Sequence, residues 1–158
     1  MFDSYFMLIF SEAIVEQLGT PYKPQILSAF DACWDFLENK DRGGEELYAI
    51  LDDGTDYGGL FIYMQLDDNE ADVPSWDNMT YAIATIAKVA YSYENKTELP
   101  SPLENIDDSL IENFIENLKE INFNFYDYVQ DVKDFLALGK SPSKEEAINE
   151  LKRIGLLQ

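Results

Sequence analysis

The chain has 158 residues, of which 46% are hydrophobic and 14% aromatic, and its formal net charge is −20. This length suits one ordinary domain, and the aromatic content excludes a disordered acidic tail. The negative charge argues against direct binding to nucleic acids or to anionic membranes. One cysteine and no histidine exclude intrachain disulfides, Ser-His-Asp and Cys-His nucleophilic systems, and zinc sites that need imidazole.

The N-terminal residues predict the compartment. The first four residues carry no basic side chain, and the apolar run Phe6–Phe10 is followed by Ser11 and Glu12. This is not the pattern of a secretory signal, and no uncharged apolar stretch approaches the roughly 18 residues that span a bilayer. We therefore expect a cytoplasmic protein, which the single cysteine also favours.

Helical spacing dominates the first 40 residues. Apolar residues recur at helical intervals from Ser4 to Leu18, and a Gly-Thr-Pro sequence follows. A second helix is predicted to begin near Pro24, with Cys33 and Trp34 on its apolar face. We expect Cys33 to be a packed, inert thiol, because neighbouring aspartates disfavour a thiolate.

The next segment combines short elements with turns. A short helix is predicted over 45–51, and residues 52–59 are rich in the Asp and Gly of turns. Leu60 to Leu66 form an apolar run that periodicity alone assigns to neither helix nor strand. We favour a helix there because the neighbouring segments are helical.

A long helix follows, predicted to begin with Ser75 as its N-cap and to end near Tyr93. Its sequence is apolar nearly all round, with Lys88 as the one charged residue of its interior, which is typical of a central buried helix.

Further helices are predicted from Leu110 onward, with a bend at 122–124. Ser143 and Glu146 have the spacing of a capping box at the start of the last helix. We find no repeat and no domain boundary. The sequence therefore predicts an all-α fold in a single domain, 1–158, with six to eight helices around a central buried helix at about 75–93.

Acidic residues are concentrated in one stretch. Between Gly43 and Ala87 there are ten carboxylates and no lysine or arginine, which accounts for half of the net charge. Such one-sided charge opposes folding by self-repulsion, so it suggests attraction to a basic partner. The alternatives are solubility or adaptation to a saline habitat.

We predict that this stretch makes the partner contact, with two aromatic side chains as anchors. Trp76 has two readings, because it lies at a helix start and either packs into the core or remains exposed among acids. The candidate partner-binding residues are Asp52, Asp53, Asp56, Tyr57, Asp67, Asp68, Glu70, Asp72 and Trp76.

Carboxylate chemistry is the main catalytic alternative. Pairs such as Asp52 with Asp56, or Asp67 with Glu70, have the groups for acid–base catalysis, but a solvated surface explains most of the 31 acids equally well. An EF-hand is disfavoured, because Val73 stands where the loop needs glycine. We expect no catalytic residue, no metal and no cofactor.

One stretch resembles a known family. The segment Pro74–Ala82, together with Tyr91 and the loop Leu99–Glu104, is similar to an all-helical immunity protein family of bacterial polymorphic toxin systems, and the similarity is best over Trp76–Leu118. This resemblance implies a non-enzymatic protein that binds and neutralises a cognate toxin encoded beside it. It transfers no functional residue to this chain.

The charge and the resemblance predict the same function, an immunity protein whose acidic surface faces a basic toxin site. A nuclease fits such a partner, since nucleases must hold phosphates. An acidic adaptor for a basic helix or tail is a further alternative, as is a carboxylate-based enzyme. The oligomeric state is not predicted.

Overall fold

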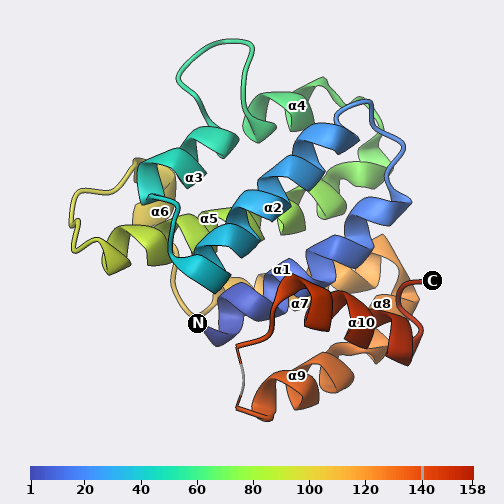
Figure 1. Cartoon of the computed structure of the whole chain (residues 1–158). Coiled ribbons are helices and arrows are strands. Elements are labelled where there is room, and N and C mark those ends of the chain that lie inside the picture. Colours follow the sequence, from blue (N-terminus) through green and yellow to red (C-terminus); the bar gives the residue numbers. More distant parts are fainter. Residues whose placement is uncertain (140) are drawn as a thin grey trace.

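The computed structural model describes residues 1–139 and 141–158, which form helices and no strands (Figure 1). Eight of the α-helices have seven residues or more, and two are shorter. The helices are α1 (Phe2–Ile14), α2 (Lys23–Asn39), α3 (Gly44–Leu51), α4 (Leu60–Leu66), α5 (Val73–Tyr93), α6 (Ser101–Glu104), α7 (Leu110–Ile121), α8 (Phe123–Asp127), α9 (Val129–Ala137) and α10 (Lys144–Ile154). Single 3-10 turns occupy Val15–Gln17 and Glu70–Asp72. The predicted all-α class is confirmed.

Helix α5 lies at the centre, as predicted, and packs against α1, α3 and α7. Its residues Ile83, Ile86 and Ala87 are fully buried. The predicted N-cap is wrong: α5 begins at Val73, and Ser75 is buried within its first turn. The 3-10 turn at Glu70–Asp72 leads directly into the helix, and Pro74 is tolerated in the first turn, where its missing N–H has no intrahelical partner to lose.

Helix α1 is a second buried element. Every residue from Ser4 to Ile14 is buried, because α5, α7, α9 and α10 all contact this helix. Phe6 and Phe10 both meet Phe114 of α7 in edge-on contacts, with ring centroids 6.1 and 6.4 Å apart. The sequence pattern predicted only one apolar face for this helix.

Helix α3 packs closely against α5 at a glycine. A Cβ on Gly44 would lie 2.6 Å from the Tyr91 ring and 2.9 Å from its backbone nitrogen, so only glycine allows this approach. The backbone N–H of Gly44 donates to Glu94 Oε1 at 2.7 Å, which satisfies one orphan donor of α3. The two contacts fix α3, and with it the loop that leads to α4.

Three other local predictions are confirmed. The apolar run Leu60–Leu66 is the helix α4, and the capping box of Ser143 and Glu146 starts α10 with both reciprocal hydrogen bonds. Cys33 is buried, and burial raises the pKa of its thiol well above the usual range. In the part of the chain described, no helix is both long and apolar enough to cross a membrane.

Candidate functional site

All the predicted binding residues except Trp76 surround helix α4, within residues 52–72, which we call the α4 segment. The loop that precedes α4 projects from the body of the molecule (Figure 1). Asp52, Asp53, Asp56 and Tyr57 belong to this loop, whereas Asp67, Asp68, Glu70 and Asp72 follow the helix. A helix of seven residues is about 10 Å long, so the candidates form two acidic groups at its two ends.

The first group is shaped by bonds to its own backbone. Asp52 Oδ1 accepts from the Gly54 N–H at 3.0 Å, and Asp53 Oδ1 accepts from the Thr55 N–H at 2.9 Å and the Thr55 hydroxyl at 2.6 Å. The bonds from Thr55 lower the pKa of Asp53. Tyr57, which is 87% exposed, extends into solvent beside these carboxylates and is available to a partner.

The second group is tied to the core through Trp76. The indole ring is only 1% exposed, and its Nε1 donates to Asp67 Oδ2 at 2.8 Å. Trp76 therefore takes the core position, the first of its two predicted readings, and presents no ring surface to a partner. Its indirect role is to position Asp67, because the hydrogen bond fixes that carboxylate at the end of α4.

Asp67 and Asp72 form an interacting pair of acids. The bond from Trp76 lowers the pKa of Asp67, with smaller help from the Asn69 N–H. Three causes together raise the pKa of Asp72 to about 6: partial burial first, then the hydrogen bond to Asp67 and the negative charge of Asp67. The pair therefore loses its second negative charge as pH falls through about 6.

This pair predicts a pH dependence of stability. The pKa of Asp72 is higher in the folded state than in the unfolded state, so the folded state binds the extra proton, and the free energy of unfolding rises as pH falls from about 7 to about 4. Asp72→Asn removes this titration and should make the rise smaller, leaving the part that comes from other acids with raised pKa values such as Glu12, and urea unfolding between these pH values measures the difference. The chain has no histidine to obscure it.

Asp68→Asn is the matched control, since Asp68 is an exposed acid of the same group. Its slope with pH should stay like that of the unmodified protein. If the free energy of unfolding changes with pH equally in the unmodified protein and in Asp72→Asn, the raised pKa of Asp72 is contradicted.

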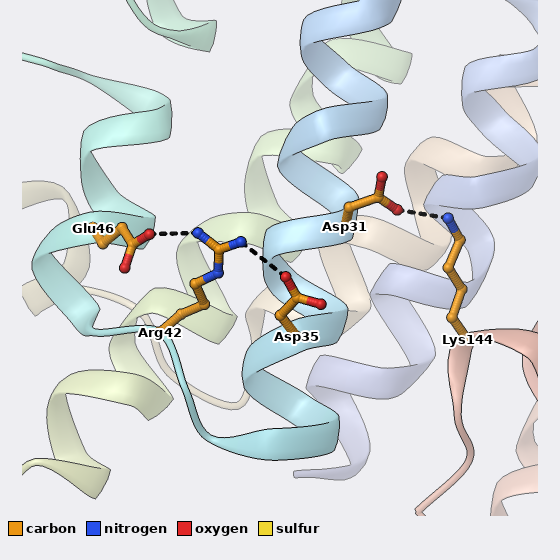
Figure 2. Close-up of polar contacts among 5 residues, drawn as sticks. All are labelled: Asp31, Asp35, Arg42, Glu46 and Lys144. Carbon is orange, nitrogen blue, oxygen red and sulfur yellow. Dashed lines mark hydrogen bonds and ion pairs between the residues drawn. The ribbon is translucent and has the colours of Figure 1, made fainter.

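The carboxylates of the α4 segment are not neutralised by neighbours. In residues 1–139 and 141–158, none of the seven acids of this segment takes part in an ion pair, and neither does Asp77 in α5. The paired basic residues lie elsewhere. Figure 2 shows Arg42 between Glu46 and Asp35, at 2.6 and 2.9 Å, and Lys144 on Asp31 at 2.6 Å.

These ion pairs hold structural elements together. Arg42 joins α2 to α3, and Lys144 joins α10 to α2 (Figure 2). They border a cleft of about 600 Å³ between α2, α3 and the start of α4, whose lining includes Asp31, Arg42 and Asp53. Arg42 and Lys144 are thus paired with acids outside the α4 segment, and the acids of the α4 segment keep their negative charge.

Helix α4 itself was missed as a candidate. Phe61, Tyr63 and Met64 pack against the core, and Tyr63 stacks on Tyr22 with ring centroids 4.4 Å apart. Leu66 is nevertheless 61% exposed, and Ile62 is half-buried one turn before it. The sequence did indicate an apolar outward face, because a helix that covers the core with one face does not need an apolar residue at nearly every position.

The catalytic alternative finds little support. Among the described residues Glu12 is the one buried acid, and burial raises its pKa although Trp34 donates to it at 3.3 Å. Glu12 borders a cleft of about 570 Å³, but the other acid there, Glu16, is exposed. No group of three or more acidic or cysteine side chains in the described part is placed to hold a metal ion.

Comparison with known families identifies the chain. Residues 3–121 match the family of immunity protein Imm6. The chain belongs to the Imm6 immunity protein family. No curated protein and no solved structure matches it. The predicted resemblance to an immunity protein family is confirmed, and membership implies a non-enzymatic, toxin-neutralising role with a cognate toxin as partner.

The Imm6 match includes every candidate residue. It extends from the start of α1 to the end of α7 and therefore contains α4 and both acidic groups. Helices α8, α9 and α10 lie outside it, although α9 and α10 pack on α1 and complete its burial.

Proposed function

We propose that this immunity protein neutralises a toxin with a basic surface, and that the α4 segment makes the contact. One observation carries the proposal: a run of carboxylates between Asp52 and Asp77 without an ion pair in the described structure. A surface of this kind attracts a positively charged protein over a long range, which accelerates association.

The toxin class follows from the same charge. An enzyme that acts on nucleic acids has a basic active site, because it must hold phosphates. An acidic inhibitor seated there would block substrate entry and replace the phosphate charges with its own carboxylates. This proposal favours a nuclease toxin as the partner. The immunity protein would bind it in the cytoplasm of the producing cell.

Co-expression tests the proposal. Cells that produce the toxin domain encoded next to this gene should survive when they also produce this chain, and should stop growing without it. An unrelated protein of similar negative charge should not protect them, because protection requires a matching surface as well as charge. Growth arrest despite abundant, folded immunity protein would contradict the proposal.

A further inference from the structure

Exposed apolar side chains gather along the α4 segment. Of nine large hydrophobic side chains exposed in the described structure, Tyr57 and Leu66 lie in this segment, and Val73 directly follows it at the start of α5. Single exposed apolar residues are ordinary on protein surfaces, but a local group of them marks a contact site.

The outward side of α4 continues this apolar surface. Ile62 and Leu66 are four residues apart and therefore lie on the same helix face, with the exposed Gln65 beside them. Leu60 and Met64 occupy the opposite face, toward the core. The helix is thus apolar both on the side it buries and on the side it presents to solvent.

The acids border this face at both ends. Asp56 lies in the loop before α4, and Asp68 and Glu70 lie in the turn after it; all three are exposed. An apolar centre within a charged border is the usual composition of a protein–protein interface. The surface therefore has the two parts that a specific contact needs.

We infer that the outward face of α4, with Ile62 and Leu66, is the apolar centre of the toxin contact. Its occupant is a protein patch that is apolar in the middle and bordered by lysine or arginine side chains. This inference rests on the proposed function. It adds that the apolar helix face holds the complex together, while the acids bring the partners into contact.

Charge complementarity excludes a second copy of this chain as the occupant. In a two-fold dimer through α4, the same patch would face itself, so the acidic groups at the helix ends would meet like charges. With a net charge of −20, two copies also repel each other as wholes. A basic partner removes both repulsions.

Truncation of the helix face tests the inference. The double variant Ile62→Ala, Leu66→Ala should bind the toxin domain encoded next to this gene with a Kd raised on the order of 10- to 100-fold. The increase should come from faster dissociation, while the association rate and its salt dependence stay nearly unchanged. Surface plasmon resonance separates the two rates. Alanine favours helix, so the substitutions should not disrupt α4. If the double variant is less stable, Leu66→Ala alone repeats the test with a single exposed change.

Leu138→Ala is the matched control, because Leu138 is 72% exposed at the C-terminal end of α9. It should bind the toxin domain like the unmodified protein. Equal binding by the α4 double variant would overturn the inference and leave the acidic contact standing. A free protein that is dimeric and becomes monomeric in the double variant would also overturn it. Failure of the unmodified protein to bind would overturn the proposed function as well.

Discussion

Ile83→Asp should lower the free energy of unfolding by several kcal/mol, of order 3–5. Ile83 is fully buried in the middle of α5, where a carboxylate would have neither water nor a basic partner. Since a domain of this kind is stable by only about 5–15 kcal/mol, the variant should be largely unfolded at 37 °C or melt far below the unmodified protein. Thermal unfolding followed by circular dichroism measures the change.

Val73→Asp is the control for this prediction. Val73 is a β-branched residue of the same helix, but it is exposed and lies at the positively polarised N-terminal end. Its melting temperature should change little. If Ile83→Asp melts like the unmodified protein, α5 is not the centre of the fold.

Reversal of three acids should slow toxin association by 10-fold or more at low salt. Asp56→Lys, Asp68→Lys and Glu70→Lys change the sign of exposed charges on both sides of α4. The difference from the unmodified protein should shrink toward 1 M salt, where the Debye length is about 3 Å. Stopped-flow mixing with the toxin domain at several salt concentrations gives these rates.

The structure dictates which acids to reverse. Asp67 holds the Trp76 indole and Asp53 accepts two bonds from Thr55, so their reversal would damage the fold and confuse the result. Reversal of the three chosen acids relieves repulsion between like charges instead. The melting temperature should therefore stay equal or rise.

Reversal of Glu112, Glu116 and Glu120 on α7 is the matched control, since it adds the same positive charge to another exposed surface. It should slow association far less. An equal effect of both triple variants would mean that only net charge matters. A larger effect on α7 would move the binding surface to that helix.

Much of the fold was predictable from sequence because helical periodicity is local. The apolar circumference of α5 predicted its central place, and the Ser143–Glu146 spacing predicted the capping box of α10. The burial of α1 on all sides was not predictable, because it depends on helices α5, α7, α9 and α10, which come much later in the chain. The start of α5 was misplaced because the preceding 3-10 turn leaves no signal in hydrophobic spacing.

The candidate site was predictable in composition and less so in arrangement. The count of carboxylates identified the α4 segment, but it could not separate the two groups at the ends of the helix. It also could not distinguish Asp67, which bonds to Trp76, from Asp68, which faces solvent. The exposure of Leu66 depends on how α4 sits on the core, so the apolar face emerged only in three dimensions.

Amide hydrogen exchange of this protein, alone and with the neighbouring toxin domain, tests the account most directly. The account predicts that the toxin slows exchange mainly in residues 52–72, the α4 segment, with little change in α7 or in α9. Protection confined to residues 110–121 or to the loop before α6, or no protection anywhere, would contradict it.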